Sequence, residues 1–334
     1  MKIAIVGAGV AGSYMLNRLD GHQVECFEMR PQDKWYTVCA WGTSEPYISE
    51  MVKRAGFNFE DYVLHRGKKM TVDSGHGTFD LHLRGLVSYD KHRLCEDMLK
   101  GHTVHWGTQV KELDGRFKDF DIVVDATGMQ RALLPKIEGD ILVPCLEYQV
   151  KSKNFPWDDF YIKPYPGLTG YLWYFPLWDG VGHIGAGELH GAYKGELEAM
   201  LKKYDCEVIR KIGRPVRIVP PSACLPFSHG KVVGVGESVG TVFPMLGEGI
   251  IPSMQCAELF IENIDDMAAY EAAVLKHTEV YTKGFKFVES KMAGKFNLMS
   301  SFPRLFSVYR FMAGNEKRFG MQTRLSDLIK LSKL

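Results

Sequence analysis

The chain begins MKIAIVGAGVAGSYMLNRLDGHQVECFEMR (residues 1–30), where an apolar run of strand length leads directly into the motif Gly7-x-Gly9-x-x-Gly12. A helical pattern of apolar residues follows, and a second predicted strand, residues 23–27, ends in Glu28. In such a unit the first glycine makes the tight turn, the second lets the backbone approach a pyrophosphate at the helix N-terminus, and the third lets helix and strand pack closely. An acid about 20 residues past the first glycine binds ribose hydroxyls. The segment therefore predicts a dinucleotide-binding unit in which Glu28 holds the adenosine ribose.

A second Gly-x-Gly-x-x-Gly motif, residues 180–185, has different surroundings. It follows Trp178 and Asp179, where an Asp-Gly turn signal joins two runs with strand character, and no helical pattern begins at its last glycine. A nucleotide-binding motif needs the strand, the helix and the acid together, and only the N-terminal copy has all three. We predict a β-hairpin at the second motif.

The composition of the 334 residues is that of an ordinary globular protein, with 46% hydrophobic and 24% charged residues. The formal net charge of +1 argues against a general electrostatic role on nucleic acid. No uninterrupted apolar stretch reaches the roughly 18 residues that a membrane span needs, and the N-terminal segment has the pattern of a core strand and not of a signal peptide. These features predict a cytoplasmic protein, or one peripheral to a membrane, with no nucleic-acid partner.

The seven cysteines lie at positions 26, 39, 95, 145, 206, 224 and 256, without a Cys-x-x-Cys pair. Their odd number and their scatter indicate neither a disulfide framework nor a zinc site. We therefore predict no metal site, and we expect most of these cysteines to be small buried apolar residues.

Three segments follow the first unit. Residues 31–60 interrupt the α/β pattern with a loop-like run rich in aromatic residues, which forms either a ligand wall or a long loop over the sheet. Residues 62–88 alternate in strand fashion around a glycine-rich turn and predict a hairpin. The run Asp121-Ile-Val-Val-Asp125-Ala-Thr127-Gly128 predicts a buried strand that ends in small residues. Because ligands bind at the carboxyl edge of an open α/β sheet, this junction is expected beside the nucleotide.

The rest of the chain changes character twice. Several short strands and one helix between residues 145 and 224 indicate a mostly antiparallel sheet. The chain then returns to a buried strand, glycines and a helix, and it ends in helices whose apolar stretch at 296–312 either packs on both domains or contacts a membrane surface. The predicted division is a discontinuous nucleotide-binding domain (1–144 and 225–265, with 39–88 facing the substrate), an antiparallel-sheet substrate domain (145–224) and a C-terminal helical segment (266–334).

Four groups of residues support a more specific prediction of the bound nucleotide and the protein family. Gly7, Gly9, Gly12 and Glu28, together with Asp125-Ala-Thr127-Gly128, match a flavin-nucleotide fingerprint. Gly170-Tyr171-Leu-Trp173-Tyr-Phe175-Pro176, followed by Gly185-Ala-Gly187, is similar to a YxWxFP and GxG run. Gly236-Glu237-Ser238 through Pro244 and Gly247-Glu-Gly249-Ile250 resembles a flavin-binding GDA…P…GGGI segment. Cys39 lies in a glycine-containing loop, in the run Val38-Cys39-Ala40-Trp41-Gly42.

With these motifs, spread over residues 1–265, the chain resembles the geranylgeranyl reductase family of flavoproteins, within the broader p-hydroxybenzoate-hydroxylase-like superfamily. The resemblance implies an α/β fold, with a Rossmann-like FAD-binding domain of glutathione-reductase type, an inserted mostly antiparallel β-sheet substrate domain and C-terminal helices. A dehydrogenase for a nicotinamide cofactor needs only the first fingerprint. A flavoprotein of this type also uses a strand and a helix from late in the sequence to hold the flavin end.

Three positions depart from the family pattern. Glu237 stands where an aspartate is usual, Glu248 where a glycine is usual, and Lys91 where the superfamily usually has arginine. Lysine keeps the charge but loses the bidentate fork, and Glu248 adds negative charge near the flavin if its side chain points inward. The resemblance implies that FAD is bound by Gly7, Gly9, Ala11, Gly12, Glu28, Met29, Arg30, Lys91, Ala126, Thr127, Gly128, Gly236, Glu237, Gly247, Gly249 and Ile250.

The resemblance also implies an activity in lipid biosynthesis, the reduction of isolated carbon–carbon double bonds of an isoprenoid or prenylated lipid. An external electron donor, NAD(P)H or ferredoxin, would first reduce the FAD. An isolated alkene cannot stabilise a carbanion, so a proton must arrive with or before the hydride. Cys39 is the candidate catalytic residue, as proton donor or as part of a relay, and its alternative is a small packed residue. The candidate substrate-binding residues are Trp41, Tyr171, Trp173, Phe175 and Pro176, of which the second to fourth share one strand face.

Two other functions remain open at this point. An FAD-dependent aromatic monooxygenase shares this fold and would bind a compact polar aromatic and need oxygen. A non-catalytic flavin-binding protein of the same fold is the second alternative, and the Glu237 and Glu248 departures are compatible with it.

Overall fold

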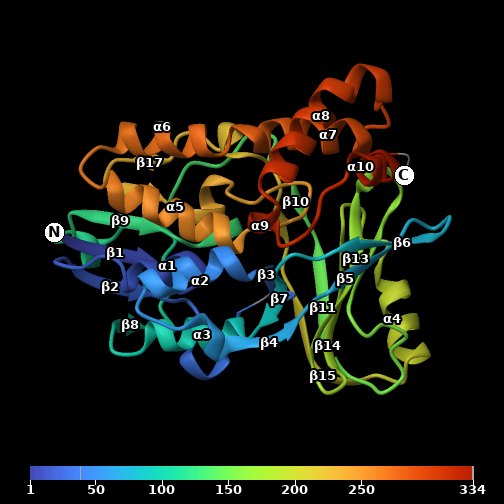
Figure 1. Ribbon diagram of the computed structural model, residues 1–334. Helices are drawn as coiled ribbons and strands as arrows, with labels where there is room; N and C mark the ends of the chain where they lie inside the picture. The colour runs from blue at the N-terminus through green and yellow to red at the C-terminus, as the bar shows by residue number, and fades with distance from the viewer. Residues whose placement is uncertain (38, 333–334) are drawn as a thin grey trace.

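The computed structural model describes residues 1–37 and 39–332 of the chain, so Val38 of the predicted cysteine loop lies outside the described residues. A six-stranded sheet carries the N-terminal motif (Figure 1). Its strands, in spatial order, are β17 (Ser228–His229), β18 (Val232–Gly234), β9 (Ile122–Asp125), β1 (Lys2–Val6), β2 (Gln23–Phe27) and β8 (Thr103–His105). All neighbours pair in parallel except β17 with β18. The central strands β1, β9 and β18 are almost entirely buried, as is typical of a parallel sheet.

The strand order of this sheet reverses at β1. The chain continues from β1 to β2 and β8 on one side, while β9 and β18 lie on the other side. Ligands bind at such a switch point, outside the carboxyl ends of the strands. Helices α1 (Val10–Leu16), α3 (Lys91–Leu99) and α5 (Ile250–Glu262) pack together against the sheet, and the buried Tyr14 hydroxyl of α1 donates to Glu258 of α5 at 2.7 Å.

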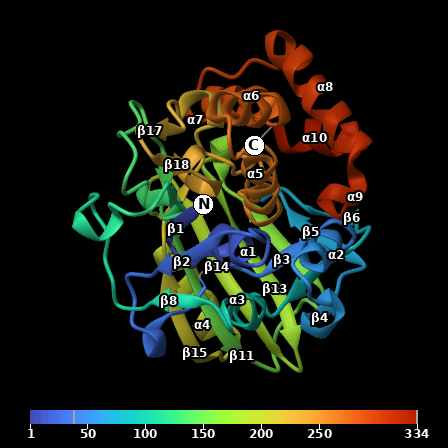
Figure 2. The ribbon, with the colours of Figure 1, turned by 90° about the vertical axis from the view of Figure 1, so that its left-hand side faces the viewer.

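A seven-stranded sheet forms the second layer, behind the first sheet in the view of Figure 2. Its neighbours pair antiparallel except for β12 with β5, which are parallel. Helix α4 (Lys194–Lys203) covers the outer face, where Leu197 packs with Tyr148, Tyr174 and Ile184. The strands, in spatial order, are β15 (Glu207–Gly213), β11 (Cys145–Lys151), β14 (Val181–Glu188), β13 (Gly170–Trp178), β12 (Phe160–Pro164), β5 (Lys69–Asp73) and β6 (Thr78–His82).

Smaller elements connect the two sheets. A three-stranded sheet is formed by β3 (Gly42–Ser44), β7 (Leu86–Tyr89) and β4 (Val63–Arg66), and β10 (Leu142–Val143) pairs with β16 (Val216–Arg217). Helix α2 (Glu45–Arg54) lies between β3 and β4 in the sequence. Short 3-10 helices occupy Gln32–Lys34, Phe59–Tyr62, Gly115–Phe117, Gly128–Gln130, Pro166–Leu168, Pro221–Ala223 and Gly236–Val239.

The C-terminal helices run along one side of both sheets (Figures 1 and 2). They are α6 (Met267–His277), α7 (Glu279–Met292), α8 (Leu298–Gly314), α9 (Glu316–Phe319) and α10 (Leu325–Ser332). Apolar residues of α7, α8 and α9 share one buried cluster with Phe160 of β12 and with Phe243, which precedes α5. The Gly320 carbonyl accepts backbone hydrogen bonds from Arg84 at 2.7 Å and from Leu86 at 3.1 Å. Within residues 1–37 and 39–332, no helix has the length and apolar character needed to cross a membrane.

The predicted fold class is confirmed, and so is the hairpin at the second glycine motif, which is the turn between β13 and β14. The loop expected over residues 31–60 is wrong at residues 45–54, which form α2. Pro46 lies in the first turn of α2, where a proline fits, and Ile48, Met51 and Val52 make its buried face. Strand β15 was not predicted, because its exposed edge position lacks an apolar pattern.

The predicted division into three parts stays a prediction, but strand pairing changes one detail of it. The hairpin of β5 and β6 was assigned to the first domain, facing the substrate. It extends the seven-stranded sheet instead, through the parallel pairing of β5 with β12. Such non-local pairing leaves no signal in the local pattern of alternating residues.

Candidate active site

A cavity of about 690 Å³ lies between the two sheets. It begins at the switch point, where Val6 ends β1, Gly7 follows it and Ala126 follows β9. From there the cavity extends to the seven-stranded sheet and the C-terminal helices. Nearly all of the predicted site residues contact it, from both predicted domains. The cavity is therefore the candidate active site.

The three glycines of the N-terminal motif have distinct surroundings. A Cβ atom on Gly7, whose φ is +107°, would lie 2.5 Å from the Ala126 carbonyl oxygen. A Cβ atom on Gly12 would overlap the Gly7 carbonyl oxygen, so this glycine lets α1 pack closely on the turn. A Cβ atom on Gly9 would meet nothing within 4 Å, and Gly9 lines the cavity. Gly9 therefore leaves room for a ligand, as the motif predicts.

Glu28 is held rigidly at the same end of the cavity. Its carboxylate accepts a backbone hydrogen bond from Ala8 at 3.0 Å and another from Arg30 at 2.9 Å. The side chain is buried, and Glu28, Met29 and Arg30 all line the cavity. This geometry fits the predicted contact with a ribose.

Asp125 fixes the loop after β9. Its buried carboxylate accepts hydrogen bonds from the Thr127 hydroxyl at 2.6 Å, the Thr127 backbone at 3.0 Å and the Leu133 backbone at 2.8 Å. The loop thereby presents Ala126, Thr127 and Gly128 to the cavity. The Asp125 carboxylate therefore fixes the position of this loop.

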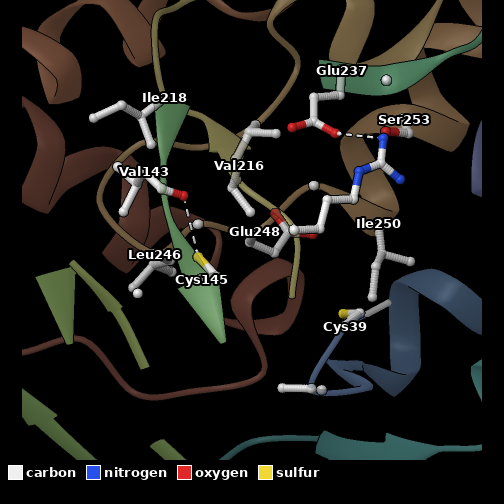
Figure 3. Close-up of a pocket in the computed structure, with 18 of the residues that line it drawn as sticks. Cys39, Val143, Cys145, Val216, Ile218, Glu237, Leu246, Glu248, Ile250 and Ser253 are labelled. Atoms are coloured by element: carbon white, nitrogen blue, oxygen red, sulfur yellow. Dashed lines mark hydrogen bonds and ion pairs between the residues drawn. The ribbon is translucent and has the colours of Figure 1, made fainter. Parts of the chain in front are cut away.

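Glu237, the first departure from the family pattern, has partners that the sequence did not indicate. Its carboxylate accepts a backbone hydrogen bond from Arg217 at 2.9 Å and lies 4.0 Å from the Arg214 guanidinium (Figure 3). Arg214 lines the cavity beside Gly128, whereas Arg217 forms an ion pair with Asp140 at 3.0 Å. Both arginines come after β15 in the sequence, about 20 residues before Glu237. Their contacts with Glu237 depend on the tertiary structure, so the sequence pattern did not predict them.

Glu248, the second departure, does not leave an uncompensated charge at the cavity. Its carboxylate forms an ion pair with Arg318 of α9 at 2.7 Å, and the Arg318 side chain is only 7% exposed. Gly247, Gly249 and Ile250 line the cavity on either side of Glu248. The pair joins the loop before α5 to the C-terminal helices.

The inner face of the seven-stranded sheet forms the opposite wall. Tyr171, Trp173 and Phe175 all line the cavity, as their alternation in β13 predicts. A Cβ atom on Gly185 would overlap the Trp173 indole, and one on Gly187 would lie 2.5 Å from the Cys145 sulfur. The two glycines of β14 therefore leave the space that these large side chains fill.

Two cysteines reach the cavity from different elements (Figure 3). Cys39 is half-buried, and its sulfur accepts a hydrogen bond from the Trp41 backbone at 3.4 Å. The Cys145 thiol, at the start of β11, donates to the Val143 carbonyl at 3.4 Å, and burial raises its pKa to about 12. Cys39 lines the cavity, and its role as a catalytic residue stays a prediction.

Some predicted residues do not line the cavity. Trp41 is buried with Leu177 and Val181 and contacts the His183 ring edge-on, with the ring centroids 4.7 Å apart. Pro176 lies on β13 one residue after Phe175, and its carbonyl accepts a hydrogen bond from the Ser88 hydroxyl. The alternation of β13 turns Pro176 away from the face that holds Phe175. Both residues therefore lie outside the cavity lining, and their role as substrate contacts stays a prediction.

Of the remaining predicted cofactor residues, Gly12 and Gly236 pack behind the cavity. The φ of Gly236 is +79°, and a Cβ atom on it would lie 3.2 Å from the Ala11 methyl group. Ala11 and Lys91 do line the cavity, and Lys91 is buried.

The part of the cavity that the second sheet and the C-terminal helices enclose is mostly apolar, and sequence reasoning did not identify it. Its walls come from β5, β6, β12, helices α7 to α10 and the loops beside them, with Gln322, Thr323, Arg324 and Asp327 as polar neighbours. The residues are Met70, Leu81, Ile162, Leu168, Met245, Phe287, Val288, Met292, Met312, Phe319, Met321, Leu328 and Leu331, which we call the apolar chamber. No local pattern links these segments, because each contributes at most three residues.

Comparisons with known proteins agree with this architecture. No known protein-family model matches the sequence. An uncharacterized protein of Methanocaldococcus jannaschii is 25% identical over 351 residues, which cover 90% of this chain and 93% of that protein. A geranylgeranyl bacteriochlorophyll reductase-like protein of Thermoplasma acidophilum superimposes with a TM-score of 0.71 at 14% identity, over 98% of each chain. PqsL of Pseudomonas aeruginosa, a probable FAD-dependent monooxygenase, superimposes with a TM-score of 0.63 at 14% identity, over 89% of this chain and 99% of that one.

The chain therefore has the fold seen in FAD-dependent oxidoreductases. At these identities the likeness establishes the architecture and not the reaction. The FAD-oxidoreductase fold agrees with three observations on the cavity: the open space at Gly9, the fixed carboxylate of Glu28 and the loop of Gly247 and Gly249 at the start of α5. The residues present therefore fit a flavin dinucleotide.

Proposed function

We propose that the protein is an FAD-dependent enzyme that reduces isolated carbon–carbon double bonds in an isoprenoid chain. One observation supports this substrate class above all: the cavity that holds the nucleotide motif continues into the apolar chamber. The thirteen apolar residues of the chamber surround a space suited to a long hydrocarbon, whose transfer out of water is favourable.

The residues that would hold FAD are those at the nucleotide end and at the start of α5. Glu28 would bind the ribose, Gly9 would allow the pyrophosphate to approach, and Gly249 and Ile250 would lie beside the flavin. When bound and reduced by NAD(P)H or ferredoxin, the flavin supplies the hydride. Lys91, buried at the start of α3, contributes positive charge to the same cavity.

The other residues bind the chain and exclude water. Tyr171, Trp173 and Phe175 form an aromatic wall, and the Tyr171 hydroxyl donates to the Leu246 carbonyl at 2.6 Å, which ties this wall to the loop before α5. The apolar chamber holds the prenyl tail, so that one double bond lies beside the flavin. Cys39 lines the same space and is the candidate proton donor or relay inferred from the sequence.

The reaction can be tested by product analysis. We expect the reduced protein, under anaerobic conditions, to convert a geranylgeranyl lipid into products that carry two additional hydrogens for each bond reduced, as measured by mass spectrometry. The same lipid with oxidised protein is the control and should be recovered unchanged. A protein that leaves the lipid unchanged but couples NAD(P)H oxidation to oxygen consumption on an aromatic substrate would instead be a monooxygenase.

We also propose that α8 contacts the membrane that supplies the lipid. Met299 is 89% exposed, and Phe302 and Phe306 are 40% and 39% exposed, although all three are large apolar residues. Phe302 and Phe306 stack with a centroid distance of 6.0 Å, so they project from one face of the helix. Such a face can bury itself in the interfacial region of a bilayer.

The membrane contact predicts a difference in vesicle binding. Replacing Met299, Phe302 and Phe306 together by serine should weaken binding to anionic vesicles about tenfold or more, because the apolar area that enters the bilayer is lost. Co-sedimentation measures the effect. The matched control is Ile209→Ser, which removes an exposed apolar side chain from β15. Equal binding of the triple variant and this control would contradict the contact.

A further inference from the structure

Glu147 is a cavity-lining residue that has no role in the function described above. It belongs to β11, where it pairs with Gly185 of β14, and Gly185 in turn pairs with Trp173 of β13. Because both residues pair directly with Gly185, the side chains of Glu147 and Trp173 lie on the same face of the sheet. Both residues line the cavity. His183, two residues before Gly185, shares this face.

The polar groups of this cluster lack the partners that buried groups normally have. Among the described residues, no well-aligned hydrogen bond reaches the Glu147 carboxyl oxygens, the His183 ring nitrogens or the Trp173 indole nitrogen. The nearest polar groups are the Trp173 indole, which acts to lower the pKa of Glu147, and the backbone of Cys39 and Ala40, which acts to raise the pKa of His183. His183 Nδ1 also lies 3.5 Å from Glu147 Oε1. Glu147 is 3% exposed and His183 is fully buried. Unpartnered buried polar groups are costly and indicate a function or an absent ligand.

The burial of Glu147 favours its neutral form. Burial raises the pKa of Glu147 to about 8, although the positive charge of Lys91 opposes this shift. Burial also lowers the pKa of His183 to about 3, so His183 is neutral and offers Glu147 no cation. The other titratable groups that act on this part of the cavity are Tyr36, Cys145 and Arg210, and Arg210 stacks over the Tyr36 ring at 3.9 Å. A carboxylic acid therefore stands in the cavity wall at neutral pH.

We propose that Glu147 is the catalytic acid of the reduction, the group that gives a proton to one carbon of the substrate double bond. The inference rests on the proposed function. The π bond breaks, the proton of the Glu147 carboxyl forms one new C–H bond, and a hydride from the reduced flavin forms the other. Glu147 is left as a carboxylate and regains its proton from solvent, while the external donor reduces the flavin again. Cys39 then serves as a wall of the site and not as the source of the proton.

The protonation of Glu147 can be measured without turnover. Infrared difference spectroscopy on the FAD-loaded protein should show a carboxylic-acid C=O band at neutral pH that disappears as the pH rises through about 8. The band should be absent from Glu147→Gln and retained in Cys39→Ala. The matched control is Glu188→Gln on β14, because hydrogen bonds from the His190 and Ala192 backbone help to hold the pKa of Glu188 below its usual value, so that it carries no acid proton. A Glu147 that is ionised at neutral pH would overturn the proposal.

Single-turnover kinetics then separate this inference from the function itself. Glu147→Gln should bind FAD and be reduced by dithionite as the wild type is, but should transfer its electrons to a geranylgeranyl lipid about 10²- to 10⁴-fold more slowly, which is the usual contribution of a general acid. The wild-type rate should fall as the pH rises above about 8, where Glu147 loses its proton. If the wild type reduces the lipid and Glu147→Gln does so equally fast, the inference is wrong while the function stands. If the wild type reduces no isoprenoid, the function fails and the catalytic role of Glu147 fails with it.

Discussion

Replacing Gly12 by alanine is expected to destabilise the fold, whereas the same change at Gly9 is expected to remove FAD and leave the fold intact. The added methyl group at position 12 would overlap the Gly7 carbonyl oxygen and lie 3.2 Å from Ile5, both in or beside β1. Helix α1 would have to move off the sheet, at a cost of about 3 kcal/mol. Denaturant unfolding of the FAD-free protein measures this loss.

Gly9→Ala is the matched variant in the same motif. The φ of Gly9 is −76°, which any residue adopts, and its Cβ atom would enter open space at the cavity. The unfolding free energy should therefore remain within about 0.5 kcal/mol of the wild type. FAD affinity should fall about tenfold or more, because the methyl group occupies the path of the pyrophosphate. Tight FAD binding by Gly9→Ala, measured by flavin fluorescence, would contradict the placement of the cofactor.

The second large effect is expected at the ion pair of Arg318 and Glu248. Arg318→Ala would leave the Glu248 carboxylate, 17% exposed, without the cation that lies 2.7 Å from it. Loss of one partner of a buried pair destabilises a protein by about 3–5 kcal/mol. The loop of Gly247 and Gly249 would also lose its connection to α9, so we expect weaker FAD binding along with a lower unfolding free energy.

A double variant distinguishes the loss of the pair from a simple loss of packing. Arg318→Met combined with Glu248→Gln leaves no charge buried, and it should recover a large part of the stability that Arg318→Ala loses. Arg310→Ala, on the exposed side of α8, is the control and should change the unfolding free energy by less than about 0.5 kcal/mol. A loss of similar size in the single and double variants would show that packing, and not charge, explains the effect.

The nucleotide end of the site could be predicted because its chemistry is local. Gly7, Gly9 and Gly12 lie within six residues, and Glu28 follows at a fixed separation. This short segment therefore predicts both the strand–helix unit and its ligand. The alternation of Tyr171, Trp173 and Phe175 likewise identified a shared face before any strand partner was known.

The remaining parts depend on contacts between distant segments. Glu147 looks like an ordinary polar residue in a strand, and only the pairing of β11 with β14 and β13 reveals that it is buried. Arg318 lies 70 residues from Glu248, and the apolar chamber draws single residues from many elements. The position of Trp41 outside the cavity lining has a related cause, because its φ of +63° could not be inferred from the sequence.

The most direct test of the central claim is the absorption spectrum of the purified protein after anaerobic reduction with dithionite and addition of a geranylgeranyl lipid. The account predicts oxidised flavin bands before reduction, their loss with dithionite, and their return when the lipid is added in the absence of oxygen. Flavin that stays bleached with the lipid and is reoxidised only when air is admitted would contradict the assignment as a prenyl reductase, and a protein without flavin would contradict the cofactor itself.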